Sequence, residues 1–232
     1  MILHVVGRAL AARNIARAIV ATDDPRILKV VEDAGFEAMM TAAEHPSGSD
    51  RLAEVAAGLD GVDLIVNVQG DEPLISPQTI ERAVDALAGD DEAQIVTTCE
   101  PLTQAADVLS PDVVKVVTDV HGRALYFSRS PIPYPREAVR RHGTLRAALE
   151  LEPSLLSRFR KHTGLYAYRR GFLLEYTGWP QSELERDESL EQLRALERGI
   201  TIRVIETRSP SIGVDTEQDL ERVRRMMEGS QS

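Results

Sequence analysis

The sequence contains one cysteine, few aromatic residues and no long hydrophobic run. Cys99 stands alone among 232 residues, which excludes an internal disulfide framework and a cysteine-based zinc site and fits a reducing cytosol. Aromatic residues make up only 4%, so the core must consist of Val, Ile, Leu and Ala, as in parallel-sheet proteins. No apolar stretch approaches the ~20 residues that span a bilayer. The first eight residues lack the apolar core and cleavage site of a signal peptide.

Positive charge is also in deficit. The chain has 27 Lys and Arg against 37 Asp and Glu, a formal net charge of −10. This excludes nucleic acid as an expected partner, because duplex binding needs basic residues clustered on one face. An acidic protein that handles anionic substrates must concentrate positive charge locally or recruit a metal ion.

Short β-branched runs alternate with helical patterns through the first 100 residues. After an opening helix at 1–13, we expect strands at 18–21, 37–41, 64–68 and 95–98 and helices at 25–34, 49–59 and 77–87. The run 64–68 is apolar enough to be buried on both faces. This alternation predicts βαβ units, and hence an α/β fold with a mostly parallel sheet.

The remainder of the chain changes character. The pattern predicts a hairpin over 113–127 that turns at Gly122, and a charged helical arm at about 135–160 that is either an insertion or a dimer contact. It then predicts strands at 164–168 and 200–205, a helix at 184–199, and a last helix at 216–227 with Thr216 as its N-cap.

The strongest local signal lies at 66–73, where a buried strand ends in Gln69, Gly70 and Asp71. Open α/β sheets bind ligands at the carboxyl ends of their strands. Gly70 allows close backbone approach, and Asp71 could hold Mg²⁺ through one carboxylate together with phosphate oxygens. A strand terminator and helix cap would use the same residues, so both interpretations stay open.

Other candidates are individually weaker. Asp215 stands directly before an expected helix, and an aspartate at such a position is most often a helix cap. Ser47 and Gly48 begin another expected helix, whose free amides suit an anion or a base edge. Arg129 follows a strand and could grip a carboxylate with its planar fork. Glu188 and Gln192 lie four apart, hence on one face of the expected helix.

Taken in order, eight segments resemble the CMP-Kdo synthetases, which activate the acid sugar 3-deoxy-manno-octulosonate (Kdo). The segments are 21–23, 45–54, 66–73, 110–117, 124–133, 162–169, 190–196 and 213–220, so the resemblance covers almost the whole chain. It implies a Rossmann-like nucleotidyltransferase sheet with a smaller dimerisation lobe at about 113–180, in a cytoplasmic homodimer. It also implies that CTP and Kdo give CMP-Kdo and pyrophosphate for lipopolysaccharide synthesis.

The resemblance also implies roles for single residues. Asp71 and Asp215 are the expected Mg²⁺ ligands and catalytic residues. Three residues are expected near the nucleotide: Ser47, Gly48 and Gln69. Five are expected to line the sugar pocket, with Arg129 meeting the Kdo carboxylate: Arg129, His162, Tyr166, Glu188 and Gln192.

The sequence departs from the family at its start. Family members place a strand and a phosphate-binding loop before the helix that begins here at Met1, so we expect a single domain that is truncated at its N-terminus. Loss of the loop should impair catalysis, since one preorganised donor can supply ~10²–10³ in rate. Smaller departures are Ser49, Asp187 and the arm at 136–160.

Two alternatives remain open from the sequence. One is a cytidylyltransferase for another acid sugar, such as 8-amino-Kdo or a sialic acid. The other is a non-catalytic paralogue that acts as a binding partner, although decay of that kind would be expected to erode Asp71 and Asp215, and both are present.

Overall fold

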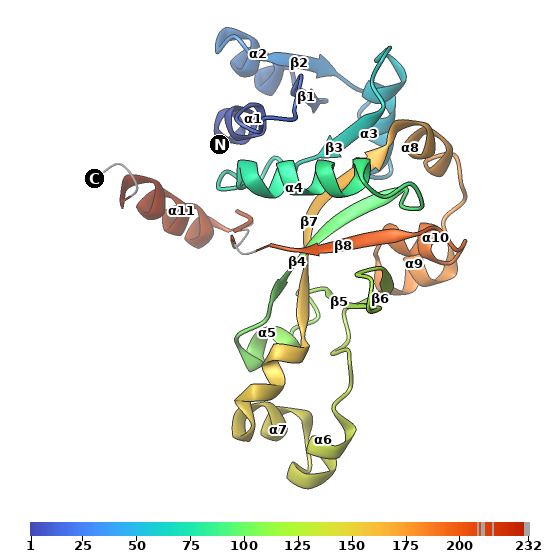
Figure 1. The fold of residues 1–232 in the computed structure, drawn as a ribbon. Coiled ribbons are helices and arrows are strands. Elements are labelled where there is room, and N and C mark those ends of the chain that lie inside the picture. The colour runs from blue at the N-terminus through green and yellow to red at the C-terminus, as the bar shows by residue number, and fades with distance from the viewer. Residues whose placement is uncertain (208, 210–211, 215, 230–232) are drawn as a thin grey trace. The chain divides into compact units, whose positions relative to one another are not determined.

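The computed structural model describes residues 1–232 with the exception of 208, 210, 211, 215 and 230–232 (Figure 1). The chain forms two compact units. Unit 1 comprises Met1–Gly89, Leu165–Trp179 and Ser209–Ser232, and unit 2 comprises Asp90–Gly164 and Pro180–Arg208. No helix of the described residues is long and apolar enough to cross a membrane.

Unit 1 is built of parallel and antiparallel strand pairs with helices between them. Its elements are α1 (Ile2–Leu10), β1 (Ile19–Thr22), α2 (Pro25–Asp33), β2 (Glu37–Met40), α3 (Gly48–Ala57), β3 (Leu64–Asn67), α4 (Pro77–Ala88), the second half of β7 (Arg160–Arg169), α8 (Arg170–Tyr176) and α11 (Glu217–Gly229). Strands β1 and β2 pair in parallel, and β3 pairs antiparallel with β7. The expected opening helix and the strands and helices up to α4 are therefore confirmed.

Local sequence explains where several of these elements begin. Asp24 accepts a hydrogen bond from the Arg26 amide at 2.8 Å and stands before Pro25, so α2 starts with a side-chain cap and a proline whose missing N–H costs nothing there. Val6 of α1, Val20 of β1 and Val31 of α2 form one buried cluster, which fixes both helices onto the β1–β2 pair.

Unit 2 contains the rest of the elements. They are β4 (Ile95–Pro101), α5 (Ala105–Leu109), β5 (Lys115–Thr118), β6 (Ala124–Ser128), α6 (Arg136–His142), α7 (Leu145–Leu151), the 3₁₀ helix η1 (Pro153–Arg158), the first half of β7, α9 (Glu183–Glu188), α10 (Gln192–Leu196) and β8 (Ile202–Glu206). The strand order is β6-β5-β7-β4-β8. The hairpin β5–β6 turns at Gly122, whose φ of 79° lies in the left-handed region that glycine tolerates.

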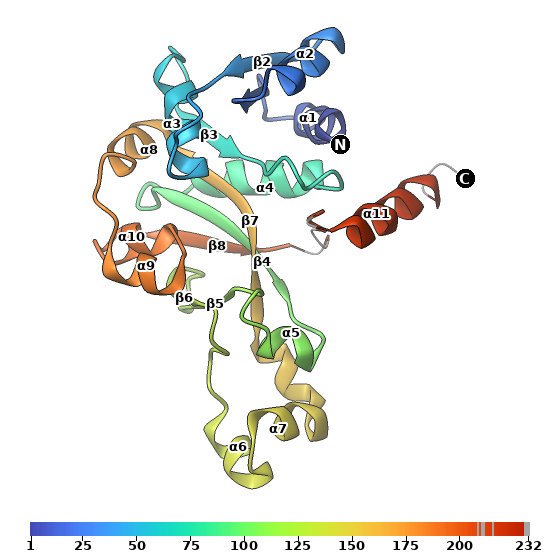
Figure 2. The ribbon, with the colours of Figure 1, turned by 180° about the vertical axis from the view of Figure 1, so that it is seen from behind.

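The predicted arm has a core of its own inside unit 2. Helices α6 and α7 lie side by side (Figure 2). Ala138, Ala148 and Leu149 of these helices pack with Val108 of α5 and Phe159 in one buried cluster. The arm is helical, as predicted, whereas its apolar cluster was not anticipated from the sequence.

The class of fold is confirmed, but the sheet is mixed where a mostly parallel one was expected. Parallel pairs join β1 to β2 and β4 to β8, whereas β3–β7, β5–β6 and β5–β7 are antiparallel. The expectation that β3 is buried on both faces is also wrong, because only Ile65 of its four residues is buried. The reason is that all four residues border an open cleft in unit 1.

The expected helix at 184–199 is broken in two, which is a second correction. Ser189 adopts a left-handed conformation with φ of 52°, and this ends α9 before α10 begins at Gln192. A buried ion pair spans the break, because Arg194 donates from Nε to Glu185 Oε2 at 2.7 Å and from Nη2 to Oε1 at 2.5 Å. Glu188 and Gln192 consequently do not share a helix face.

We predict that this ion pair supports the break. Replacing Glu185 with Ala leaves the Arg194 guanidinium, whose side chain is 10% exposed, without its carboxylate, so the free energy of unfolding should fall by about 3 kcal/mol. Urea unfolding measures the change. The matched control is Asp33→Ala, which removes an exposed ion pair with Lys29 and should have a much smaller effect. Equal losses in the two variants would contradict the prediction.

Candidate functional site

The carboxyl end of β3 carries the strongest candidate group, in unit 1. Gln69 and Gly70 are exposed and Asp71 is half-buried in the turn that follows the strand. The Gln69 carbonyl accepts a hydrogen bond from the Glu72 amide at 3.2 Å. The N-cap of α4 is Ser76, so Asp71 does not cap that helix. The structure therefore removes the cap interpretation and leaves the Asp71 carboxylate available at the end of a strand.

A second segment of unit 1 reaches the same turn. The Val214 amide donates to the Asp71 carbonyl at 2.9 Å. Thr216 caps α11, since its Oγ1 accepts from the Asp219 amide at 3.2 Å, which confirms the predicted N-cap. Asp215 lies outside the described residues. Among the residues that the structure describes, no group of three or more His, Cys, Asp or Glu is arranged to hold a metal ion.

Ser47 and Gly48 form the start of α3. Ser47 accepts a hydrogen bond from the Asp50 amide at 3.2 Å and donates its own hydroxyl proton to Asp50 Oδ2 at 2.6 Å. Ser47 is thus a helix cap whatever else it does. Gly48 is exposed, and a Cβ at its position would meet no atom within 4 Å, so a ligand could approach the backbone there.

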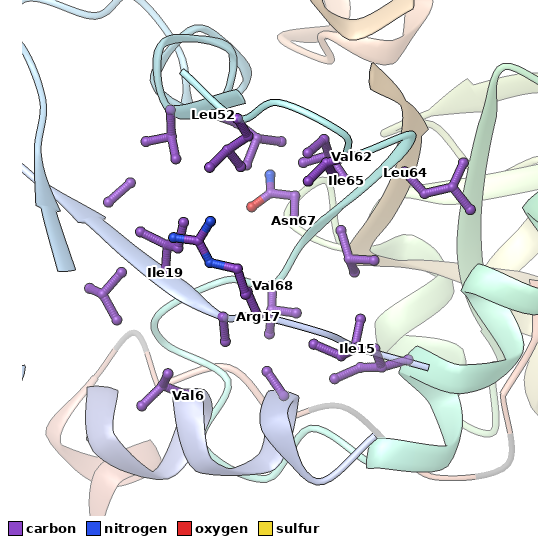
Figure 3. A pocket seen from close by; sticks show the side chains of 18 of the residues that line it. Val6, Ile15, Arg17, Ile19, Leu52, Val62, Leu64, Ile65, Asn67 and Val68 are labelled. Atoms are coloured by element: carbon purple, nitrogen blue, oxygen red, sulfur yellow. The ribbon is translucent and has the colours of Figure 1, made fainter. Parts of the chain in front are cut away.

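Gly48 and Gln69 line one cleft of about 680 Å³ in unit 1. Its wall is largely apolar, with Val6 of α1, Ile19 of β1, Leu52 of α3 and Ile65 of β3 pointing into it (Figure 3). The volume is in the range of ligand pockets. Of the expected nucleotide residues, the structure therefore brings two to a shared cleft, and Ser47 stands beside them in sequence.

Arg51 is a residue of this region to which the sequence analysis gave no role. It lines the cleft, and its guanidinium donates to Thr41 Oγ1 at 2.5 Å and lies 3.3 Å from Asp23 Oδ2. A positively charged arginine in the first turn of a helix is unfavourable next to the positive end of the helix dipole. That unfavourable position was the feature of the sequence that could have marked Arg51 as a functional candidate. Its tie to Asp23 joins the segment after β1 to α3.

Tyr166 is also in unit 1. It lies on β7 opposite Asn67, the last residue of β3, and its ring stacks on Tyr168 with centroids 5.7 Å apart and planes at 19°. The structure therefore groups Tyr166 with Gln69 and Asp71 along the β3–β7 pair.

Arg129 and Glu188 come together in unit 2. The Glu188 carboxylate accepts the Ser128 hydroxyl proton at 2.6 Å and the Arg129 amide at 2.8 Å. The Arg129 guanidinium donates to three main-chain carbonyls, those of Glu188 at 2.7 Å, Pro111 at 3.0 Å and Ser189 at 3.4 Å. No described carboxylate forms an ion pair with it, so a fixed cation is presented without a protein anion.

Lys115 supports this arrangement and was missed as a functional candidate. It is fully buried, and its ammonium donates to the carbonyls of Ser110 at 2.9 Å, Val113 at 2.6 Å and Arg129. Burial lowers the pKa of this amine below its usual range. The sequence could have marked Lys115 as a candidate, because it is the one lysine within the apolar run 113–117 and an unpaired lysine is rarely buried.

Gln192 and His162 complete the predicted sugar residues of unit 2. Gln192 is buried, and its Nε2 has no hydrogen-bond partner among the residues that the structure describes, which is unusual for a buried polar group. His162 Nε2 lies 2.9 Å from Thr97 Oγ1, and its ring meets Phe127 edge-on at 5.1 Å. Burial lowers the pKa of His162 to about 3, so the imidazole is neutral at pH 7.

A cytidylyltransferase family model matches residues 1–202. A 3-deoxy-manno-octulosonate cytidylyltransferase from Trichlorobacter lovleyi is 51% identical, over 98% of this chain and 88% of the relative. The chain belongs to the 3-deoxy-manno-octulosonate cytidylyltransferase family. A member from Geobacter sulfurreducens is 48% identical, over 96% of this chain and 87% of the relative.

Solved structures agree with this family. The structure of a CMP:2-keto-3-deoxy-manno-octonic acid synthetase complexed with CTP has a TM-score of 0.86 and 42% identity, and the match covers 99% of this chain and 88% of the other. A 4-diphosphocytidyl-2C-methyl-D-erythritol synthase from Anaerococcus prevotii shares 14% identity with a TM-score of 0.59, over 98% of this chain and 88% of the other, which shows the fold alone.

The neutral state of His162 predicts a specific loss of stability in acid. Its pKa is about 3 in the folded chain and about 6.5 when unfolded, so the unfolded chain takes up the proton first as pH falls. Stability should therefore decrease below pH 6.5. Between pH 7 and pH 5 this one group should cost about 2 kcal/mol.

Urea unfolding of the parent chain and His162→Gln at both pH values measures this. The variant should lose less stability on acidification, by about that amount. His121→Gln, at an exposed position of the β5–β6 turn, is the control and should behave as the parent does. An unchanged pH dependence in His162→Gln would contradict the assignment.

Proposed function

We propose that this chain is the catalytic body of an enzyme that joins CTP to Kdo. The anomeric hydroxyl oxygen of Kdo forms a bond to the α-phosphorus and releases its proton to water. The bond from that phosphorus to the oxygen bridging the α- and β-phosphates breaks, and pyrophosphate leaves with CMP-Kdo as the other product. The observation that carries the proposal is the half-buried Asp71 carboxylate after β3, which pairs with no described side chain, together with the hydrogen bond from the Val214 amide to the Asp71 main-chain carbonyl.

Mg²⁺ is the cofactor that we propose for this site, held by Asp71 and Asp215. Asp71 fits this role because a hard cation of this kind uses one or two carboxylates together with substrate phosphates. The bond between Val214 and Asp71 supports the pairing, since it ties the chain directly before position 215 to Asp71. When bound, the cation would neutralise phosphate charge in a protein of net charge −10.

The nucleotide would lie at the start of α3 and the end of β3. Gly48 leaves the backbone open to approach, and the first amides of a ten-residue helix are donors for an anion or a base edge. Gln69 is exposed at the end of β3 and offers both an amide donor and an acceptor. Ser47 would contribute mainly by capping the helix that presents these groups.

Arg129 and Gln192 would make the main contacts to the sugar, and Glu188, His162 and Tyr166 would support them. The Arg129 guanidinium is held by carbonyls and has no carboxylate partner among the described residues, which suits it to the Kdo carboxylate. Gln192 Nε2 is a buried donor that lacks an acceptor. The Glu188 carboxylate orients Arg129 by accepting a hydrogen bond from the Arg129 main-chain amide. His162 would supply a neutral imidazole and Tyr166 a phenol.

Three further assignments follow the family resemblance. We propose a single nucleotidyltransferase domain with a smaller lobe at about 113–180 and a homodimer formed through that lobe. Leu125 at 61% and Tyr134 at 60% exposure give the lobe apolar surface that a second copy could cover. The proposed location is the cytoplasm, where a buried free thiol such as Cys99 stays reduced.

We predict that Asp71→Asn lowers the rate of pyrophosphate release from CTP and Kdo with Mg²⁺ by at least ~100-fold, because a neutral amide holds the cation that faces the phosphates much more weakly than a carboxylate does. The assay should use this chain and a form extended upstream of Met1. Asp60→Asn, at an exposed acid before β3, is the control and should retain the parent rate. If neither parent form releases pyrophosphate although both are folded, the catalytic proposal is wrong. That result would favour the alternative of a non-catalytic paralogue that acts as a binding partner.

We predict that Arg129→Lys weakens the binding of Kdo and leaves the binding of CTP unchanged. A lysine keeps the charge but loses the planar fork, so the KM for Kdo should rise roughly 10- to 100-fold while the KM for CTP stays the same. Initial rates at varied concentrations of each substrate separate the two, and 8-amino-Kdo and a sialic acid serve as competitors. Arg140→Lys, on the exposed side of α6, is the control. A rise in the KM for CTP would refute the assignment.

A further inference from the structure

Lys115 of β5 is a buried cation whose hydrogen-bond partners are all main-chain carbonyls. Its side chain is fully buried, and its ammonium donates to the carbonyls of Ser110 at 2.9 Å and Val113 at 2.6 Å, and also to the carbonyl of Arg129. A neutral amine has only two hydrogens, so three acceptors require the protonated form. The group is therefore an ammonium that is held in place by carbonyl dipoles.

A buried ammonium of this kind is costly for the fold. Burial lowers the pKa of Lys115, and the nearby Glu188 carboxylate only partly counteracts this effect. A methionine would fill a similar volume without the cost of taking a charge out of water. Because the side chain is not exposed, it cannot touch a substrate. The contribution of Lys115 must therefore come from the carbonyls that it binds.

The first effect of Lys115 is on the backbone of Arg129. The Arg129 carbonyl accepts a hydrogen bond from Lys115, and the Arg129 amide donates to Glu188 Oε2 at 2.8 Å. The peptide groups on the two sides of the Arg129 Cα are thus both held, one by a cation and the other by an anion. The backbone conformation of a residue limits its side-chain rotamers. These two bonds therefore fix the direction in which the Arg129 side chain leaves the main chain.

The second effect is on the segment 110–113, which receives the guanidinium. Arg129 Nη1 donates to the Pro111 carbonyl at 3.0 Å. The carbonyls that flank this one along the chain, those of Ser110 and Val113, both accept from the Lys115 ammonium. One cation therefore ties the backbone of Arg129 to the segment that binds the Arg129 guanidinium.

The other acceptors of the guanidinium come from the break between α9 and α10. They are the carbonyls of Glu188 at 2.7 Å and Ser189 at 3.4 Å. Helix α10 packs against β6, the strand that leads into Arg129 (Figure 1). Two separate segments of unit 2 thus hold the guanidinium, and Lys115 is bound to one of them.

We propose that Lys115 is a positioning residue, whose ammonium fixes the Arg129 guanidinium in the orientation in which it meets the carboxylate of the acid sugar. The inference rests on the proposed function in one respect, because that carboxylate belongs to Kdo only if Arg129 binds Kdo. The orientation of Arg129 by Lys115 is a property of unit 2 alone and can be measured without a substrate.

The test is chemical rescue of Lys115→Ala in this chain. The substitution removes the side chain from Cγ to Nζ, which n-propylammonium matches atom for atom, and 1-propanol is the uncharged control of the same size. The first measurement is the solvent exchange of the Arg129 Nε–H by NMR, because this proton is donated to the Glu188 carbonyl. Exchange should be roughly tenfold faster in Lys115→Ala, since the hydrogen bond is less well held. It should return to the parent rate with n-propylammonium and not with 1-propanol.

Calorimetric titration with Kdo and with CTP is the second measurement. The dissociation constant for Kdo should rise roughly tenfold in Lys115→Ala and fall again with n-propylammonium, because a displaced guanidinium loses part of its paired hydrogen bonds to a carboxylate. The dissociation constant for CTP should stay the same. The matched control is Ile202→Ala, which removes buried apolar contacts of β8 opposite Ile95 and should change neither constant.

A second variant, Lys115→Met, keeps most of the volume and should show the same faster exchange without rescue, because it leaves no space for the amine. Unchanged exchange of the Arg129 Nε–H in both variants would overturn the inference. Equal rescue by 1-propanol would also overturn it, because the lysine would then act only by filling space. If exchange responds as expected but Arg129→Lys does not weaken the binding of Kdo, the orientation of Arg129 by Lys115 stands and the proposed contact between Arg129 and Kdo is wrong.

Discussion

The antiparallel pairing of β3 with β7 is the interaction on which the candidate site of unit 1 depends. Its register sets Asn67 opposite Tyr166 and Leu64 opposite Arg169. The pair is tied to its surroundings by hydrogen bonds at the Leu64 end, where the Arg170 amide donates to the Asp63 carbonyl at 2.8 Å and Arg170 Nε to the Ala56 carbonyl at 2.8 Å. The turn that carries Gln69 and Asp71 leaves the opposite end of the same strand. Because β7 is the one described strand partner of β3, this pairing sets where the strand ends and the turn can begin.

Unit 2 meets the shortage of positive charge in a different way. Its two important cations, Lys115 and Arg129, are bound by main-chain carbonyls and not by carboxylates. Carbonyl dipoles fix a cation without cancelling its charge, whereas a carboxylate would neutralise it. A protein with ten excess negative charges can therefore present an arginine to an anion, provided that the arginine is kept from its own acids. Glu188 does not neutralise the Arg129 guanidinium, since its carboxylate accepts hydrogen bonds from the Arg129 main-chain amide and the Ser128 hydroxyl.

Local signals predicted the elements whose ends are decided locally. Asp24 and Pro25 start α2, Thr216 starts α11, and Gly122 turns the hairpin, all as expected from short-range chemistry. The break at Ser189 could not be predicted in this way, because a bond between Glu185 and Arg194, nine residues apart, supports a left-handed serine. The mixed sheet had no local signal either. The antiparallel direction of β7 is a property of the fold, and the sequence of a strand says little about which way its neighbour runs.

The candidate residues divide by whether their own polar groups are already used. On sequence grounds Ser47 and Asp71 both stood at possible turns and caps, although the segment of Asp71 was the stronger signal. In the structure the Ser47 hydroxyl is already used, since it accepts from the Asp50 amide and donates to the Asp50 carboxylate. Asp71 is not used in this way, because Ser76 occupies the N-cap position of α4. Gln192 shows the same distinction in the interior, because a buried amide donor without an acceptor destabilises the fold unless something else completes it. Groups that the fold leaves unsatisfied are therefore the better guide to ligand contacts, and sequence cannot identify them, since satisfaction depends on neighbours that only the tertiary structure supplies.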